Sequence, residues 1–406
     1  MPEQLPIKRN TFLLASVLAV YLAVLSLGAA VLSLTFVLVT GFKVLLGAGP
    51  AIYLTASALS AFPAGRAMDR YGRVPVIVAG FALGSVGCVL TAGGTHWSST
   101  LLVIPGFVLI GVSGAVTLLI RTAAGDMYPP ERRARGISLV LFGSVFGAVL
   151  GPAVFGPLFA DKDVAADTLT LPWLVAAGLS LVALAIALMV RPDPKVIGEK
   201  IAAAGPTPAP TGAAPLSEVL RRPGVIPSML AAIVSFGVMV SVMNLTGYVV
   251  VDHHHHDQGS VFLIVAAHVL GMYALVLVIG TLIDRIGRSP SLVGGLSIMA
   301  VSCAGLMWFD SVPATAALLF GLGLGWNLSF VSATAQLADA TRPAERGKVL
   351  GLNDLLAGLT GAGLALLGGV ALDVLGVAAL AVGATMLAVA PAIFLARLRP
   401  AAEATG

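Results

Sequence analysis

Charged residues are scarce in this sequence. Only 10% of its 406 residues are Asp, Glu, Lys or Arg, whereas a soluble domain carries about 25%. Hydrophobic residues make up 58%, and the mean hydropathy is +1.00. One domain cannot hide so much apolar surface from water, so the composition excludes a soluble globular protein and indicates a protein embedded in a lipid bilayer.

Cysteine is also nearly absent. Cys88 and Cys303 lie far apart in apolar segments, which excludes a disulfide framework and predicts two packing residues. We find no nucleophile–base pattern and no phosphate-binding loop, so we expect neither an enzyme nor a bound cofactor. The net charge of +4 comes from basic residues in loops and at helix ends, a distribution that does not indicate nucleic-acid binding.

Long apolar runs replace the alternating pattern of a barrel. A spanning backbone must satisfy its own hydrogen bonds, either as helices or as a closed barrel with segments of about ten alternating residues. The runs here are longer, as in Leu174–Val190 and Val349–Val370, so helices are expected. We predict twelve membrane-spanning helices, at 11–35, 45–66, 74–93, 99–121, 136–159, 170–190, 224–247, 260–282, 290–308, 312–335, 347–370 and 374–396.

The basic residues are unevenly distributed among the predicted loops. If the N-terminus is cytoplasmic, all 23 Lys and Arg residues except Lys43 and Lys162 fall in cytoplasmic segments. Loops that remain inside the cell show this bias. We therefore predict a protein of the cell inner membrane with both termini in the cytoplasm, and we expect a monomer.

One stretch near the middle of the chain differs from the rest. Residues 191–223 contain the Pro-, Ala- and Gly-rich segment Ala202–Pro215, which is typical of a flexible linker. This linker separates residues 1–190 from residues 224–406, and each of these parts holds six predicted helices. The predicted architecture is two six-helix bundles joined by a cytoplasmic linker.

The two halves repeat short motifs. A nine-residue motif in the first half, Gly65-Arg-Ala-Met-Asp-Arg-Tyr-Gly-Arg73, recurs with an offset of 215 residues as Gly280-Thr-Leu-Ile-Asp-Arg-Ile-Gly-Arg288. A second motif that begins at Asp126 recurs loosely from Asp339, with an offset of 213 residues. Two motifs at nearly one offset indicate a duplicated unit. Duplicated bundles are typical of secondary transporters, whose substrate sites lie near the bilayer midplane.

The nine-residue pattern resembles the signature of the major facilitator family. The resemblance implies an all-α fold of two pseudo-symmetric six-helix bundles, with a gate at the cytoplasmic face. In each copy the aspartate would bind a helix N-terminus or a neighbouring arginine, the second glycine would permit a tight turn, and the last arginine would complete a charge network. The implied gating residues are Gly65, Asp69, Arg70, Gly72, Arg73, Gly280, Asp284, Arg285, Gly287 and Arg288.

Methionine and histidine gather in one window of the second half. Met239 and Met243 are one helical turn apart in the predicted helix 224–247, and His268 and Met272 are one turn apart in the next. The two pairs have similar predicted depths. Thioether and imidazole ligands favour copper(I), and a histidine inside a membrane helix indicates a functional site.

This pattern of Met-x-x-x-Met followed by His-x-x-x-Met resembles the CcoA-like branch of copper importers within the major facilitators. The resemblance implies that the four residues bind copper during import. The alternative is a carrier of a small organic solute such as a drug or a flavin, because relatives of that branch include riboflavin transporters. In that case the methionines line an apolar cavity. Asn244, Trp326 and Asn327 are further candidates to line the pathway.

A run of histidines occupies the predicted outer loop between those two helices. Clustered imidazoles there could capture a metal ion before transport, whereas the alternative is an ordinary solvated turn. The run consists of His253, His254, His255 and His256.

Asp354 is the acidic residue that lies well inside a predicted helix, beside Asn353. A carboxylate at such a position is a candidate for proton coupling. The alternative is a structural pair with a basic residue of the inner gate. The sequence alone therefore predicts a transporter and leaves a copper ion and a small organic solute both open as its substrate.

Overall fold

The computed structural model describes residues 5–129, 132–159, 165–203 and 214–397. Within those ranges all regular elements are helices, as the sequence predicts. They are α1 (Ile7–Thr40), α2 (Ala48–Tyr71), α3 (Arg73–His96), α4 (Thr100–Leu118), α5 (Ile120–Asp126), α6 (Arg133–Phe159), α7 (Thr170–Leu188), α8 (Pro194–Ala203), α9 (Leu216–Val219), α10 (Val225–Tyr248), α11 (Gln258–Tyr273), α12 (Val276–Ile286), α13 (Arg288–Gly305), α14 (Val312–Asp339), α15 (Pro343–Leu375) and α16 (Val377–Arg397). Short helical turns cover Lys43–Leu45, Asp167–Leu169 and Val249–His253.

Most of these helices are long and apolar enough to cross a bilayer. In the described part of the chain ten segments meet that condition, and α11 with α12, bent by 41° at their break, makes an eleventh. The 18-residue helix α13 does not meet that condition, although α13 packs against α14 and α16. Each of the twelve predicted ranges coincides with a helix or a broken helix, so the count of twelve crossings depends on α13.

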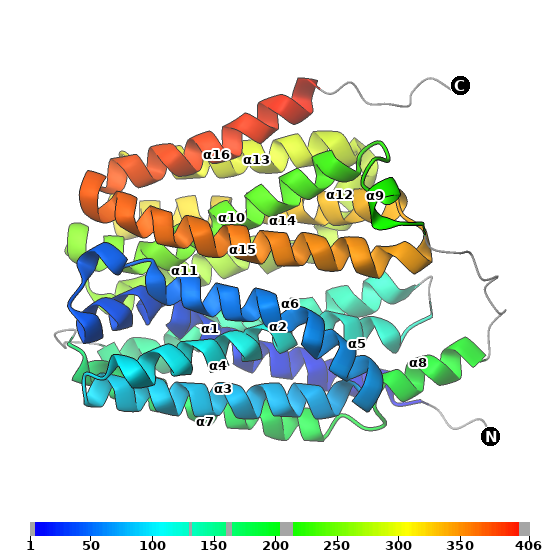
Figure 1. Ribbon diagram of the computed structural model, residues 1–406, viewed down its shortest axis with the longest axis horizontal. Helices are drawn as coiled ribbons and strands as arrows, with labels where there is room; N and C mark the ends of the chain where they lie inside the picture. Colours follow the sequence, from blue (N-terminus) through cyan, green and yellow to red (C-terminus); the bar gives the residue numbers. More distant parts are fainter. Residues whose placement is uncertain (1–4, 130–131, 160–164, 204–213, 398–406) are drawn as a thin grey trace.

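The helices form two bundles with the same internal packing. In Figure 1 the first half, coloured blue to green, occupies the lower part of the view and the second half the upper part. In the first bundle α3 packs against α4 and α7, and α1 packs against α6. The corresponding pairs of the second bundle are α13 with α14, α13 with α16, and α10 with α15. The internal duplication is therefore visible in three dimensions.

The predicted linker contains two helices, α8 and α9. The sequence predicts a flexible segment over all of 191–223, and the structure differs because residues 194–203 form a regular helix beside the first bundle. Residues 204–213 lie outside the described part of the chain. We return below to how α8 begins.

The seam between the bundles is closed at one end. We call the end with the turns at Gly72 and Gly287 the motif end, and the end where α1 stops and α2 starts the far end. At the far end, Gln258 donates a hydrogen bond to the carbonyl of Ala30 (3.1 Å), and Ser33 donates one to the carbonyl of Asn244 (3.1 Å). Both bonds connect one bundle to the other.

Aromatic rings complete the far-end closure. Phe262 of α11 stacks on Phe155 of α6 with ring centroids 6.0 Å apart, and Phe159 lies 5.4 Å from the same ring. Phe155 and Phe262 are fully buried. We call these three rings the aromatic seal.

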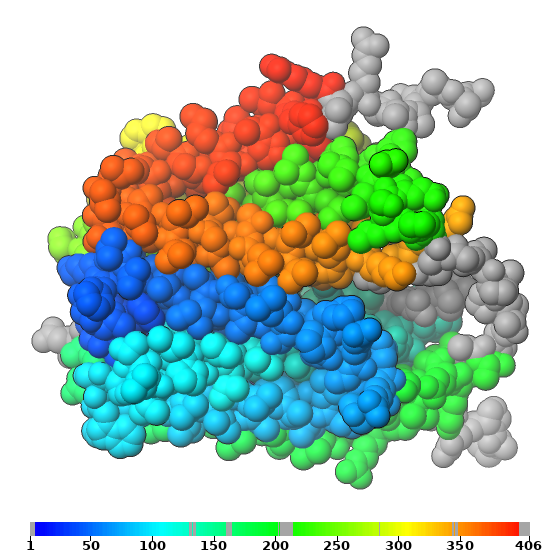
Figure 2. Space-filling view, viewed as in Figure 1, coloured from blue at the N-terminus to red at the C-terminus, as the bar shows by residue number. Residues whose placement is uncertain are grey.

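Towards the motif end, α2 and α15 separate. They touch at Gly47 and Ala365, and a Cβ built on Gly358 would lie 2.7 Å from the Cβ of Ala58; Figure 2 shows the blue and orange helices in contact at the left. Two turns further along the same helix faces, a Cβ built on Gly65 or Gly351 would meet nothing within 4 Å. The seam is therefore closed at the far end, and α2 and α15 are apart at the motif end.

Candidate substrate site and gate

Both copies of the nine-residue motif form the same backbone turn. Gly72 has φ 102° and ψ 167°, and Gly287 has φ 91° and ψ 159°. Each residue ends one helix and directly precedes the next. Because residues with a side chain rarely adopt such φ values, both positions require glycine. The sequence repeat is thus also a repeat of backbone conformation.

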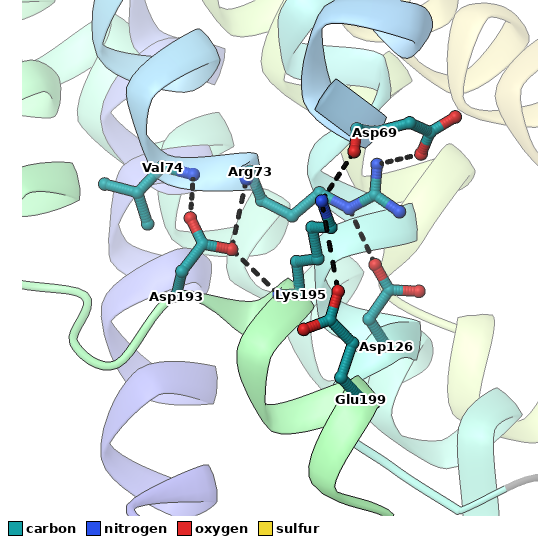
Figure 3. Close-up of polar contacts among 7 residues, drawn as sticks. All are labelled: Asp69, Arg73, Val74, Asp126, Asp193, Lys195 and Glu199. Atoms are coloured by element: carbon teal, nitrogen blue, oxygen red, sulfur yellow. Dashed lines mark hydrogen bonds and ion pairs between the residues drawn. The ribbon is translucent and has the colours of Figure 1, made fainter. Parts of the chain in front are cut away.

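A charge network surrounds the first copy of the motif. The guanidinium of Arg73 donates to Asp69 at 2.7 Å and to Asp126 at 2.7 Å (Figure 3). In the second copy, the guanidinium of Arg288 lies 3.5 Å from Asp339. The aspartate of the second repeated motif thus faces the last arginine of the first motif in both halves.

The other gating residues lie at the surface of the motif end. Arg70 lies over the ring of Tyr71, 5.1 Å from its centroid, and Arg285 is exposed. A Cβ built on Gly280 would meet nothing within 4 Å, as at Gly65. The side chain of Asp284 lies outside the described part of the structure. A gating role for this set remains a prediction.

The four predicted copper residues are buried inside the second bundle. Met239 and Met243 lie on α10, and His268 and Met272 on α11. The Nδ1 atom of His268 lies 2.9 Å from the carbonyl of Leu319 on α14. Within the described residues its Nε2 atom has no hydrogen-bond partner.

The orientation of the second pair follows from close helix packing. A Cβ built on Gly323 of α14 would meet the carbonyl of His268 and would lie 3.2 Å from Cγ of Met272. Both side chains of the α11 pair thus lie at the contact between α11 and α14. Because α10 also packs against α14, that helix adjoins the two helices that carry the pairs. Copper binding at these residues stays a prediction.

The histidine run forms a turn at the far end. His253 packs edge-on against Tyr248, and His256 lies 3.0 Å from the carbonyl of Asp310. His255 has a φ of 56°, and burial lowers the pKa of His254. Among the residues that the structure describes, no three His, Cys, Asp or Glu side chains converge as metal ligands. Metal capture by this loop therefore stays a prediction.

Three asparagines, Asn244, Asn327 and Asn353, are buried polar residues. Asn244 donates to the carbonyl of Val240 at 2.7 Å. Asn327 donates to the carbonyl of Met272, next to the break between α11 and α12 where helical bonding is interrupted. The side-chain oxygens of Asn327 and Asn353 have no partner within the described residues.

Trp326 belongs to a continuous row of aromatic side chains from three helices. Trp326 and Phe330, both on α14, stack with centroids 5.0 Å apart and an interplanar angle of 20°. Tyr273 at the end of α11 lies 6.3 Å from Trp326, and Phe236 of α10 lies 6.5 Å from Phe330. We call these four residues the aromatic row. All but Trp326 are half-buried.

An ion pair connects the two bundles. Arg121 of α5 donates to Asp354 of α15 at 2.6 Å, and each side chain is 33% exposed. Through Tyr273, the aromatic row includes a residue at the end of α11, a helix that packs against α6 of the first bundle.

Sequence reasoning named Trp326 and Asp354 as candidates but did not name the other three residues of the aromatic row. The spacing of Trp326 and Phe330, four residues apart on one helix, is a local signal for a shared face. Phe236 and Tyr273 come from other helices, so only the tertiary structure brings them to the row. Clusters of aromatic side chains with a few polar groups often take part in binding small organic molecules.

Two matching bundles of apolar helices, with an ion pair across their seam, are the architecture of a class of membrane carriers. A family model described as Major Facilitator Superfamily matches residues 11–267 and 243–406. The chain belongs to this superfamily, and it is a multi-pass membrane transporter.

Two curated bacterial relatives match most of the chain. The MFS-type transporter YdeG of Bacillus subtilis is 33% identical over 322 residues, which cover 78% of this chain and 74% of YdeG. The riboflavin transporter RfnT of Brucella anthropi is 33% identical over 306 residues, which cover 74% of this chain and 73% of RfnT.

Solved structures show the same fold. The inward-open xylose transporter XylE of E. coli has a TM-score of 0.70 at 14% identity, covering 98% of both chains. The human organic anion transporter MFSD10 has a TM-score of 0.65 at 17% identity, covering 97% of this chain and 100% of that chain. At these identities the similarity concerns the fold.

Proposed function

We propose that this transporter carries a flat aromatic organic solute across the membrane, with riboflavin as the first candidate. The observation that carries the proposal is the aromatic row, because it brings stacked aromatic rings from three helices together. A solute that extends from this row to Arg121 of the first bundle would contact both bundles at once. Its binding can therefore be coupled to their relative movement.

The chemistry of the row suits a planar heterocycle. Aromatic rings stack favourably at centroid distances of about 4.5–7 Å, and stacking of a base on an aromatic side chain is worth about 1–3 kcal/mol. The tricyclic ring of riboflavin offers two faces for stacking. Its edge carries carbonyl oxygens and an imide N–H, for which Arg121 and Asp354 provide a donor and an acceptor.

The 33% identity to a riboflavin transporter supports this class of solute. The distribution of Lys and Arg supports a cytoplasmic position for the motif end and for both termini. With that orientation, the structure represents a cytoplasm-facing state. Asp354, paired to Arg121 across the seam, is the proposed site of proton coupling.

Copper is the second candidate substrate. The observation in its favour is the buried Nε2 atom of His268, which has no partner in the described part of the structure, next to Met272 on the same helix face. Two further thioethers, of Met239 and Met243, are buried on α10, which packs against α14. A copper(I) ion here would be coordinated by soft, uncharged ligands.

Parallel uptake measurements distinguish the two substrates. Membrane vesicles that contain the protein are supplied with labelled riboflavin or labelled copper, and Trp326→Ala is compared with Met239→Leu and His268→Leu. We expect riboflavin uptake that is lost in Trp326→Ala and retained in the other two variants. Copper uptake that depends on Met239 and His268, without riboflavin uptake, would assign the second function instead.

A further inference from the structure

The start of the linker is bound to the first gating motif. Asp193 accepts hydrogen bonds from the backbone N–H groups of Arg73 (3.1 Å) and Val74 (2.8 Å), as Figure 3 shows. These are the first two amides of α3, which have no partner within their own helix. A carboxylate is favoured at this position because the N-terminus of a helix carries partial positive charge.

Gly72 makes this contact possible. A Cβ built on Gly72 would lie 2.8 Å from the Oδ2 atom of Asp193, closer than real Cβ atoms approach. The residue also has a φ of 102°. Glycine is therefore required here both by the backbone turn and by the carboxylate of the linker.

The rest of α8 contacts the same network. Lys195 donates from its backbone to Asp193 (2.8 Å) and from its ammonium group to the carbonyl of Asp69 (2.6 Å). One turn later, a Cβ built on Gly198 would lie 2.9 Å from the carbonyl of Asp126. The linker helix thus contacts the two elements whose carboxylates bind Arg73.

The second copy of the motif is less crowded. A Cβ built on Gly287 would meet only atoms of Pro290, at 3.6 Å or more, whereas the one on Gly72 meets Asp193. The two halves share the turn but differ in what is bound to it. The linker therefore adds a contact at the first gate that has no described equivalent at Gly287.

We propose that Asp193 is a positioning residue for gating. Its carboxylate fixes the turn between α2 and α3, so that one guanidinium of Arg73 can bind Asp69 and Asp126 together. In the described state α2 and α15 are apart at this end, and alternating access requires them to approach. When this turn is already fixed, closure of the motif end costs less conformational entropy. This inference requires alternating access and is independent of the solute.

A reporter cysteine at the far end measures the closure of the motif end. Ser33 is buried under the far-end seam, and the native cysteines Cys88 and Cys303 are fully buried. In Ser33→Cys protein, a membrane-impermeant maleimide labels the reporter from outside only when the far end opens, which accompanies closure of the motif end. The labelling rate is measured without any solute, so it does not depend on the proposed substrate.

We expect Asp193→Ala to slow labelling by about tenfold, the effect of losing a helix N-terminal cap. Gly72→Ala should slow it similarly, and the double variant should be no slower than either, because both changes remove the same contact. The matched control is Glu199→Gln on α8, whose carboxylate is exposed and lies 3.9 Å from the ammonium group of Lys195. This control should label at the parent rate.

Unchanged or faster labelling in Asp193→Ala would overturn the proposal. So would a lower melting temperature with an unchanged labelling rate, because that result assigns Asp193 a purely structural role. If Asp193→Ala does not fold, Asp193→Asn provides the measurement. It keeps one acceptor oxygen and should slow labelling by about threefold, and a rate equal to that of Glu199→Gln would equally overturn the proposal.

Discussion

The carboxylate of Asp354 on α15 lies 2.6 Å from the guanidinium of Arg121 on α5, so that this ion pair joins the two bundles. Both side chains are one-third exposed. Pairs that remain accessible to water contribute about 0–1 kcal/mol. The interaction is thus weak enough to form and break in each transport cycle, and a proton or a solute group can compete for either partner.

The ion pair leads to a prediction about energy coupling. Replacing Asp354 by Asn removes the proton-binding group and keeps the size of the side chain. We expect uphill accumulation of the solute to be lost, while exchange of labelled for unlabelled solute across vesicles is retained. Glu199→Gln serves as the control. Equal loss of accumulation and exchange would show that Asp354 does not couple transport to protons.

The aromatic row predicts a separation of affinity from turnover. Trp326→Leu should raise the KM for riboflavin about tenfold, since one stacking contact is worth roughly 1–3 kcal/mol. Trp326→Phe keeps a ring face and should have a smaller effect. Trp308 lies between α13 and α14 and is 71% exposed. It provides the control variant Trp308→Leu. An unchanged KM in Trp326→Leu would exclude the row from the binding site.

The aromatic seal predicts the opposite phenotype to that of Asp193. Phe262→Ala removes the ring that contacts both Phe155 and Phe159, so the closed far end loses stability relative to the open one. Labelling of Ser33→Cys from outside should become about tenfold faster. Phe309→Ala, at an exposed ring, should leave the rate unchanged. Slower labelling in Phe262→Ala would contradict the seal.

A second ion pair predicts a dependence of stability on pH. Arg222 donates to Glu345 at 2.6 Å, and this bond is the main cause that lowers the pKa of Glu345 to about 2 from its usual 4.5. The pair therefore stabilises the folded state fully above pH 4.5 and loses this effect as the pH falls towards 2. The melting temperature should be lower in Glu345→Gln than in the parent.

This difference in melting temperature should be constant between pH 7 and pH 5 and shrink below the usual pKa of 4.5. Glu218→Gln, at an exposed position on α9, should show no such trend. A difference that persists unchanged in acid would mean that the pair does not stabilise the fold through the charge of Glu345.

The sequence predicts the helices well because the thickness of the hydrocarbon layer sets their length. It does not predict the breaks near Leu119 and Leu275, where the apolar run continues while the helix is interrupted. The repeated glycines of the motif were predictable as turns. The partners of the motif arginines were less predictable. Asp126 and Asp339 approach Arg73 and Arg288 only because the helices pack together.

In the linker, the overall composition predicts flexibility, whereas a local sequence signal predicts the helix that the structure contains. Its Pro, Ala and Gly content predicts flexibility, but Asp193 followed by Pro194 is also a helix-start pattern, with an N-cap and a proline in the first turn. The structure has α8 beginning at that proline. Composition describes the segment on average, whereas the cap determines where a helix can begin.

The most direct test of the central claim is a titration of the purified protein with riboflavin, followed by flavin fluorescence. Stacking of the flavin ring on Trp326 quenches this fluorescence. We predict saturable quenching by the parent protein and by Trp308→Leu, and its loss in Trp326→Leu. Fluorescence that stays unchanged with the parent, or equal quenching by Trp326→Leu, would contradict a flavin site on the aromatic row.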